Sequence, residues 1–378
     1  MQLKDLRFEP DDLTRGLDLY CVGGAVRDCL LELPIKDKDW VVVGSTPEDM
    51  FSRGFKPVGA DFPVFIHPNT GEEYALARTE RKTSKGYHGF DFFTGDVTLT
   101  EDLKRRDFTI NAMAVDSRGL VYDPYGGLTD IRDRTFRHIS ESFSEDPVRI
   151  LRLGRFLSRF PDFSVHFDTL ELCRAMVKDG EVDSLVSERV WKELSRSLVE
   201  KAPSRFFTLL HEVGAFEKLF PNMRLVQKGD ELDIGARLGF DLIHQYLVFS
   251  SYFNDFQSQN FAVPREFREY ANTLPKIIEK LRYFKIDAVS ILNIITASDG
   301  IRKPEKLLVI LEVAHHLNKY SYYDYPRVAF LEHWNELAEQ VKKIDLGDLS
   351  GLSPIEIKSK AESIRIEIIK DYIDGQKP

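Results

Sequence analysis

The chain has 378 residues, a formal net charge of −9 and a hydrophobic fraction of 43%. This length exceeds what one hydrophobic core usually serves, so we expect two or more domains, and the apolar content is ample for packed cores. The longest apolar runs, such as Trp40 to Val43 and Ile291 to Ile295, are too short for a membrane span or a signal peptide. We therefore expect a cytoplasmic protein without a membrane partner, and the negative charge means that any nucleic-acid footprint must be local.

The first informative unit is a strand, a glycine turn and a helix. Leu19 to Val22 favours a strand, and Ala25 to Leu33 favours a helix. Between them, Gly23 and Gly24 are small enough for backbone N–H groups to approach a triphosphate, and Arg27 on the first helical turn adds a charge. The loop is neither a Walker A motif nor a dinucleotide fingerprint. Taken alone, a Gly-Gly pair before a helix usually means only a tight turn.

Two carboxylates, Asp37 and Asp39, follow that helix. The apolar run from Trp40 to Val43 favours a strand, in which residues i and i+2 face the same side, so both carboxylates can reach the same ions. Oxygen ligands that leave positions open for phosphate suit Mg²⁺, and two such ions can steady the attacking and leaving oxygens at phosphorus. An isolated Asp-x-Asp is more often a solvated strand end, but its place after the glycine turn favours nucleotidyl transfer.

Short β-like runs continue to alternate with helical ones up to about Ile139, which predicts a small mixed sheet with helices. The further strands expected are Val64–His67, Tyr74–Arg78, Val121–Tyr122 and Thr135–Ile139. Glu73 directly precedes the expected strand Tyr74–Arg78. It is either a third acidic group near the metals or a solvated strand residue. The basic and aromatic segment from Arg81 to Phe93 lacks clear periodicity, and we interpret it as a mobile loop.

From Asp146 the pattern becomes helical nearly to the end of the chain. Asp146 and Pro147 predict a helix start, because the first can accept a capping hydrogen bond and the second lacks an N–H that would be orphaned. Four arginines then recur at spacings of three, three and four, which places them on about a third of the helix circumference. This arginine stripe consists of Arg149, Arg152, Arg155 and Arg159. On spacing alone, such a stripe usually means a solvated helix face.

Taken together, six ordered segments resemble the class II CCA-adding tRNA nucleotidyltransferases of bacteria, members of the polymerase-β-like superfamily. The segments are Val22–Asp28, Asp37–Pro47, Glu73–Lys82, Glu101–Ala112, Glu145–Phe156 and Glu188–Glu193. The resemblance implies an α/β head with a small mixed sheet, followed by an all-α neck, body and tail. We expect a catalytic head over residues 1–140, a neck that recognises the nucleotide base over 141–222, and a body and tail that bind tRNA over 223–378.

The resemblance also implies an activity: template-independent addition of CMP, CMP and AMP to the 3′ end of tRNA from CTP and ATP, with release of pyrophosphate. Mg²⁺ is the implied cofactor, with Asp37 and Asp39 as catalytic metal ligands. Arg106 lies in an Arg-Arg-Asp cluster that ordinarily means ion pairing at a helix end, and the family match makes it a triphosphate ligand. The nucleotide-binding residues implied are Gly24, Arg27, Arg106, Asp146, Arg149, Arg152 and Arg155. We expect no obligatory protein partner.

The order of donors and acceptors on the bases explains how one pocket can accept two nucleotides. Cytosine and adenine each offer an amino donor beside a ring-nitrogen acceptor, whereas guanine and uracil reverse the order. A carboxylate with a guanidinium, Asp146 with Arg149, matches the first pair and leaves groups unpaired against the second, at roughly 1–3 kcal/mol per contact. This pair cannot by itself order C, C and A; the resemblance implies that the growing tRNA end and a rotation of the pocket decide that switch.

Three other interpretations remain open at this stage. A poly(A) polymerase or an A-only tRNA-tailing enzyme would share the head chemistry, and a catalytically silent tRNA-binding protein would share the fold. The intact Asp-x-Asp, Arg27 and the arginine stripe weigh against the silent form. Longer relatives carry a phosphohydrolase module built on a His-Asp pair, and no histidine here is followed by aspartate, so we predict no such activity.

Overall fold

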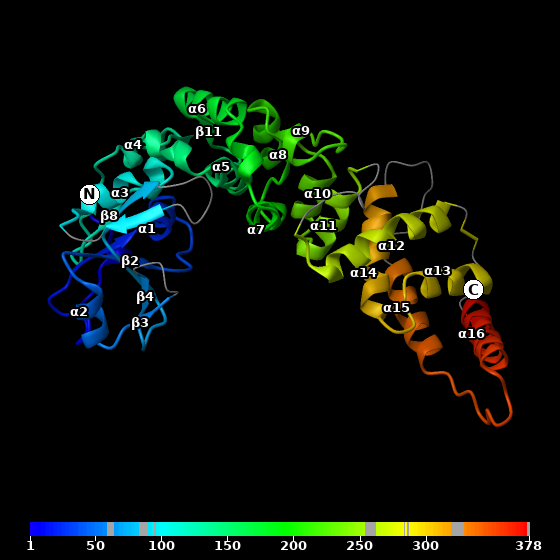
Figure 1. Cartoon of the computed structure of the whole chain (residues 1–378). Helices are drawn as coiled ribbons and strands as arrows, with labels where there is room; N and C mark the ends of the chain where they lie inside the picture. The colour runs from blue at the N-terminus through cyan, green and yellow to red at the C-terminus, as the bar shows by residue number, and fades with distance from the viewer. Residues whose placement is uncertain are drawn as a thin grey trace. The chain divides into compact units, whose positions relative to one another are not determined.

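The computed structural model describes residues 1–58, 64–82, 90–93, 96–253, 262–282, 284–285, 287–318 and 329–375 (Figure 1). The chain divides into two compact units. Unit 1 comprises Met1–Arg189 with Leu209–Leu219, and unit 2 comprises Val190–Thr208 with Phe220–Pro378. Among the described residues, no helix combines the length and the apolar character that crossing a membrane requires.

Unit 1 is built on a seven-stranded mixed sheet with the strand order β3-β4-β5-β2-β1-β8-β9. The strands are β1 (Asp18–Val22), β2 (Asp39–Val43), β3 (Lys56–Pro57), β4 (Val64–Ile66), β5 (Glu73–Leu76), β8 (Ala114–Val115) and β9 (Val121–Tyr122). Strands β2 and β5 run parallel, and the other neighbours run antiparallel. The sheet confirms the predicted α/β head.

Alternate residues of the central strands face two different cores, as the period of two in a β-strand requires. On one side, side chains of β1, β2 and β5 pack with α1 (Gly24–Leu30) and α2 (Pro47–Ser52); this cluster includes Cys21, Val26, Trp40, Met50 and Tyr74. On the other side, Val22, Val41 and Ala114 pack with Leu103 of α3 (Leu99–Lys104). Asp39 shares the parity of Val41 and therefore lies on the α3 side.

The structure corrects the prediction of a loop and the prediction of a strand. Strands β6 (Thr79–Lys82) and β7 (Phe90–Phe93) form a separate antiparallel ladder, so the predicted mobile loop is wrong for residues 81–82 and 90–93. Residues 83–89 lie outside the described part of the chain. Strand β10 (Thr135–Phe136) pairs with β11 (Ser164–Val165), apart from the main sheet. Sequence patterns did not reveal which segments pair here, because the partner of a short strand lies elsewhere in the chain.

The rest of unit 1 is mainly helical. Its elements, with two helices that continue into unit 2, are η1 (Lys4–Leu6), η2 (Thr109–Asn111), α4 (Gly127–Arg132), η3 (Glu141–Glu145), α5 (Val148–Arg159), α6 (Phe167–Lys178), η4 (Glu181–Ser184), α7 (Ser187–Leu198), α8 (Ser204–Glu212) and α9 (Phe216–Leu219). Phe136 packs against Phe156 of α5 and against Phe163, with ring centroids 5.9 and 5.1 Å away. This aromatic core fixes α5 beside the sheet domain.

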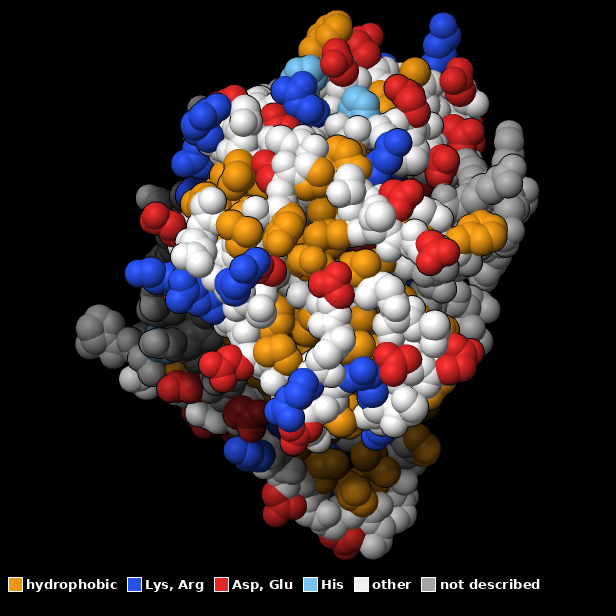
Figure 2. All heavy atoms as spheres, turned by 90° about the vertical axis from the view of Figure 1, so that its left-hand side faces the viewer, with side chains coloured by type: hydrophobic (Ala, Val, Ile, Leu, Met, Phe, Trp, Pro, Cys, Tyr) orange, Lys and Arg blue, Asp and Glu red, His pale blue; other side chains and the backbone are white. Residues whose placement is uncertain are grey.

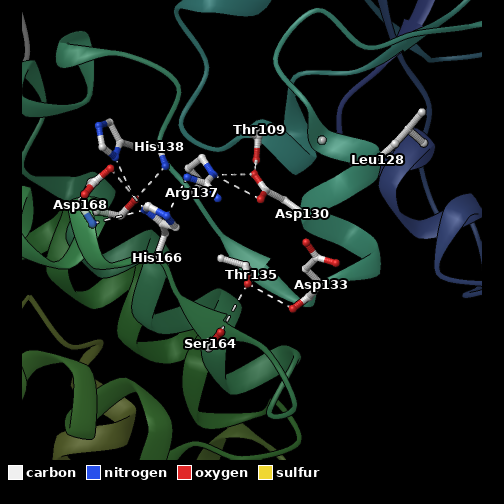
Figure 3. A network of polar contacts seen from close by, with 12 residues as sticks. Thr109, Leu128, Asp130, Asp133, Thr135, Arg137, His138, Ser164, His166 and Asp168 are labelled. Atoms are coloured by element: carbon white, nitrogen blue, oxygen red, sulfur yellow. Dashed lines mark hydrogen bonds and ion pairs between the residues drawn. The ribbon is translucent and has the colours of Figure 1, made fainter.

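A polar network fixes α6 to the same domain (Figure 3). The Arg137 Nε donates to both Asp130 carboxylate oxygens at 3.2 Å, and its Nη1 lies 2.7 Å from Nε2 of His166 at the start of α6. Thr109 donates its hydroxyl to Asp130 at 2.6 Å. His138 and Thr169 make a second link, with Nδ1 and Oγ1 2.8 Å apart. The helices after the sheet are thus held by directional contacts as well as by apolar packing.

The described part of unit 2 is built from helices. These are α10 (Glu231–Arg237), α11 (Leu242–Ser250), α12 (Arg265–Arg282), α13 (Ala288–Ala297), α14 (Pro304–Asn318), α15 (Ala329–Lys342) and α16 (Pro354–Gly375), with the ends of α7 and α8. Trp191 of α7 makes edge contacts with Tyr246 and Phe267 at 5.5 and 5.7 Å. The helical architecture confirms the expectation for the second half of the chain.

Candidate functional site

Asp39 is the first residue of β2, Asp37 lies two residues before the strand, and both residues are exposed. Among the described residues, neither carboxylate has a hydrogen bond or an ion pair. Desolvation raises the pKa of Asp39; the charge of Arg106 acts in the opposite direction, and the charge of Asp37 raises it further. The two carboxylates are therefore close enough to repel each other, and a cation bound between them would relieve that repulsion.

Glu73 lies directly beside Asp39 across the parallel β2–β5 pair, which confirms that it is on the neighbouring strand. Among the described residues, however, no three or more His, Cys, Asp or Glu side chains stand together in a group that could hold a metal ion. The arrangement offers a pair of carboxylates and leaves the remaining positions open. This suits Mg²⁺, which usually takes one or two carboxylates together with water and substrate phosphates.

The glycine turn lies against Arg106. Gly23 has a φ of 71°, in the left-handed region that favours glycine. A Cβ atom at Gly23 would lie 2.8 Å from Nη1 of Arg106, so a side chain at this position would have to displace that guanidinium. Gly24 begins α1 immediately afterwards. The Arg106 guanidinium is therefore close to the turn, and its charge also interacts with Asp39.

Arg106 is held from one side only. Its Nη2 lies 3.5 Å from Oδ2 of the fully buried Asp102, and its buried Nε has no hydrogen-bond partner among the described residues. Burial lowers the pKa of Arg106, and the carboxylates of Asp102 and Asp39 oppose that shift. Asp102 also binds Arg105 at 2.8 Å, which is the ion pairing expected at the end of a helix. Arg106 thus keeps donor capacity that a phosphate could use.

Arg27 lies deeper than the sequence suggested. Its side chain is 4% exposed, with Nε and Nη2 2.9 and 2.8 Å from Asp28 and Nη1 2.6 Å from Asn111. The guanidinium also stands 5.2 Å from the centroid of the Phe156 ring. All three guanidinium nitrogens already have protein partners, and Nη2 lies 3.5 Å from where a Cβ at Gly24 would be, so Arg27 can act on the glycine turn through its charge.

The arginine stripe on α5 is not a solvated helix face. Arg152 donates to Asp107 through Nε at 2.8 Å and Nη2 at 2.7 Å, and Arg159 binds Asp28 at 2.8 Å. Arg155 is 9% exposed and lies 4.5 Å from the Phe156 ring centroid. Both acidic partners come from the sheet domain. The stripe therefore faces the head, which the spacing of the arginines alone could not reveal.

Asp107 is the most strongly perturbed of these partners. Burial disfavours its charged form, but the charge of Arg152, hydrogen bonds from Asn111 and Arg152, and the charge of Arg149 outweigh that effect. Together they lower the pKa of Asp107 to about 2. The carboxylate is 6% exposed, so its ionised state depends on these contacts.

Residues 105–107 connect the two ends of the candidate site. Arg106 lies against the glycine turn, Asp107 binds Arg152, and the carbonyl of Arg105 accepts a hydrogen bond from Arg149 at 2.8 Å. A second hydrogen bond runs from Arg149 to the carbonyl of Ser142 at 3.0 Å. One short segment therefore fixes the arginine helix relative to the carboxylates of β2.

Asp146 has a partner that sequence reasoning missed. Its Oδ1 accepts from the N–H of Val148 at 3.1 Å, which agrees with the predicted capping role, although α5 itself begins at Val148. Arg189 donates to both carboxylate oxygens, from Nη1 to Oδ1 at 2.9 Å and from Nη2 to Oδ2 at 2.7 Å. Arg189 belongs to the Glu188–Glu193 segment, one of the six that resemble the family. Its contact with Asp146, 43 residues away, has no signature in the spacing of either segment.

Neither positive nor negative side chains dominate the part of the surface shown in Figure 2. Lys and Arg side chains and Asp and Glu side chains both occur there, with apolar side chains between them.

Comparisons with known proteins show the family of the chain. Residues 19–137 match the family model described as the Poly A polymerase head domain, and residues 162–225 match the probable RNA and SrmB-binding site of polymerase A. The chain is 44% identical over 361 residues to a CCA-adding enzyme of Bordetella bronchiseptica, covering 94% of this chain and 96% of that protein. A Multifunctional CCA protein of Azoarcus sp. is 62% identical over 205 residues, or 54% of this chain and 50% of that protein.

Solved structures show the same fold. The Bacillus stearothermophilus CCA-adding enzyme in complex with CTP matches with a TM-score of 0.68 at 22% identity, over 95% of this chain and 90% of that chain. The Thermotoga maritima CCA-adding enzyme complexed with tRNA matches with a TM-score of 0.60 at 21% identity, over 100% of this chain and 99% of that chain. Because the Bordetella enzyme is 44% identical and matches over nearly its whole length, the chain belongs to the class II CCA-adding enzymes. These enzymes have a poly(A) polymerase-type head.

Proposed function

We propose that this chain adds CMP, CMP and AMP to the 3′ end of tRNA, taking CTP and ATP and releasing pyrophosphate. The observation that best supports this function is the pair of unpartnered carboxylates, Asp37 and Asp39, beside the glycine turn and Arg106. The full-length likeness to CCA-adding enzymes supports the same choice of substrate. As a nucleotidyltransferase of this family, the chain is expected to depend on a metal, which we propose to be Mg²⁺.

In this proposal each part of the site has one task. Asp37 and Asp39 hold the metal ions, which would supply charge stabilisation at the reacting phosphorus. Gly24 and Arg106 bind the triphosphate, and Arg27 contributes its positive charge beside the turn. Asp146 and Arg149 face the base, and Arg152 and Arg155 keep the nucleotide pocket in place through α5. Glu73 acts beside the metal site without being required as a ligand.

The larger division of labour is also a proposal. Residues 1–140 would act as the catalytic head, residues 141–222 as the neck that reads the base, and residues 223–378 as the body and tail that bind tRNA. The match of residues 162–225 to a probable RNA-binding site supports a contact with RNA that begins in the neck. The acidic composition agrees with a local footprint rather than a basic surface.

The direct test is incorporation of labelled nucleotides by the purified protein. One tRNA should end before CCA and another after CC, and each of the four nucleotides should be supplied separately. We expect C on the first tRNA and A on the second. Incorporation of A alone would identify a poly(A) polymerase or an A-tailing enzyme, and binding of tRNA without incorporation would identify a silent binding protein.

A further inference from the structure

The carboxylate of Asp146 is held more firmly than a helix cap requires. Arg189 approaches it with two parallel hydrogen bonds, from Nη1 to Oδ1 at 2.9 Å and from Nη2 to Oδ2 at 2.7 Å. Both side chains are largely buried, at 20% exposed for Asp146 and 25% for Arg189. Such a bidentate pair fixes the orientation of the carboxylate plane as well as its position. A lysine could supply the charge but not the planar fork.

The hydrogen bonds already made define what Asp146 can still accept. A carboxylate has about four acceptor positions, two on each oxygen. Oδ1 accepts from Val148 N–H and from Arg189, whereas Oδ2 accepts only from Arg189 among the described residues. One acceptor position therefore remains, and it is on Oδ2. Because three hydrogen bonds hold the carboxylate, that position has a defined direction.

We propose that Arg189 is a positioning residue for base choice: it orients Asp146 so that Oδ2 presents one acceptor to the amino group of cytosine or adenine. The inference rests on the proposed function, since it requires that Asp146 face the incoming base. Uracil and guanine would place a carbonyl oxygen against the same acceptor, with no proton between the two oxygens. Arg189 acts through Asp146, with no contact to the base required.

Without the fork, the terminal torsion of Asp146 would be free over a broad range, as it is for aspartates in general. The carboxylate could then turn its open position away from the base or accept water instead. Arg149 cannot replace the fork, because its Nη1 and Nη2 atoms are directed to the carbonyls of Ser142 and Arg105. The loss should therefore appear in the choice between bases rather than in the overall rate alone.

The experiment compares kcat/KM for CTP and UTP on a tRNA ending before CCA, and for ATP and GTP on a tRNA ending after CC. The enzymes are wild type, Arg189→Ala, Arg189→Lys, Asp146→Ala and the double variant with both alanines. Arg196→Ala is the matched control, since Arg196 is an exposed arginine on the same helix. Thermal unfolding of every variant establishes that it is folded.

We expect Arg189→Ala to reduce discrimination by about tenfold, the size of one misdirected hydrogen bond. Arg189→Lys should retain part of that discrimination, and Arg196→Ala should retain all of it. In the Asp146→Ala background, loss of Arg189 should cause no further loss, because the two residues act as one unit. A merely structural role of Arg189 would instead lower kcat/KM by the same factor for all four nucleotides.

The inference is overturned if Arg189→Ala discriminates as wild type does while Asp146→Ala does not. It is also overturned if the two alanine substitutions reduce discrimination independently. Failure of the proposed function looks different, because the wild-type protein would then add neither C nor A to these tRNAs.

Discussion

The charged side chains near the start of β2 and those on α5 differ in whether they have protein partners. Asp37 and Asp39 have no hydrogen-bond or ion-pair partner among the described residues, whereas Arg152 and Arg159 of α5 are already paired with carboxylates of the sheet domain. Unpaired carboxylates are ready to receive a cation. Paired arginines instead define where the neighbouring element stands. An alanine substitution should therefore lower activity at the carboxylates and lower the stability of the fold at the arginines of α5.

The largest effect should follow loss of either β2 carboxylate. We expect Asp37→Ala or Asp39→Ala to lower nucleotide incorporation by about a hundredfold or more, because an essential electrostatic element is lost, while tRNA affinity stays nearly the same. Single-turnover incorporation and tRNA binding measure the two quantities. Asp12→Ala is a suitable control, since that carboxylate is 89% exposed and lies in a surface ion pair. Full activity of either β2 variant would refute the assigned site.

At the α5 end, Arg152→Ala should reduce stability. It leaves the buried Asp107 carboxylate without its main charged partner, which we expect to cost about 2–3 kcal/mol in the free energy of unfolding. The incorporation that remains should be weaker by a similar factor for all nucleotides, since Arg152 does not read the base edge. Arg132→Ala, which breaks an exposed pair with Asp133, should cost less than about 1 kcal/mol. Equal losses in the two variants would contradict the distinction between the ends.

The pH dependence of stability should report the same pairing. Because the pKa of Asp107 is lowered to about 2, its contribution is present above the unfolded pKa of about 4 and is lost as the pH falls toward 2. The contribution amounts to about 2 kcal/mol. Denaturant unfolding at pH 5 and at pH 2.5 measures it. Asp107→Asn should be less stable than wild type at pH 5, and this difference in the free energy of unfolding should be smaller at pH 2.5. An equal difference at both pH values would show that ionisation of Asp107 does not stabilise the fold.

The smallest predicted effect concerns the glycine turn, and it can be separated from backbone strain. Gly23→Ala and Gly16→Ala both introduce a side chain at positive φ, at 71° and 84°, with a strain of about 1–2 kcal/mol. Only Gly23→Ala also displaces Arg106, because nothing lies within 4 Å of a Cβ at Gly16. We therefore expect KM for CTP and ATP to rise in Gly23→Ala alone. Similar rises in both variants would mean that strain, and not the contact with Arg106, is responsible.

Sequence reasoning was most successful where the evidence is local. The strand after Asp39, the glycine turn, the helix start near Asp146 and the mixed sheet followed by helices were all predictable. Each depends on hydrogen bonds or side-chain periods that extend over a few neighbouring residues. Ordered motifs added the family, because several short patterns in sequence order are far more specific than any one of them.

Only the tertiary structure decided which groups meet across long distances in the chain. Arg159 meets Asp28 across 131 residues, Arg152 meets Asp107 across 45, and Arg189 meets Asp146 across 43. Periodicity tells which residues share a face of α5, but not what covers that face. The β6–β7 ladder likewise exists because two short segments pair with each other. Local propensity depends on neighbouring residues, whereas the partner of a buried charge depends on how the whole domain packs.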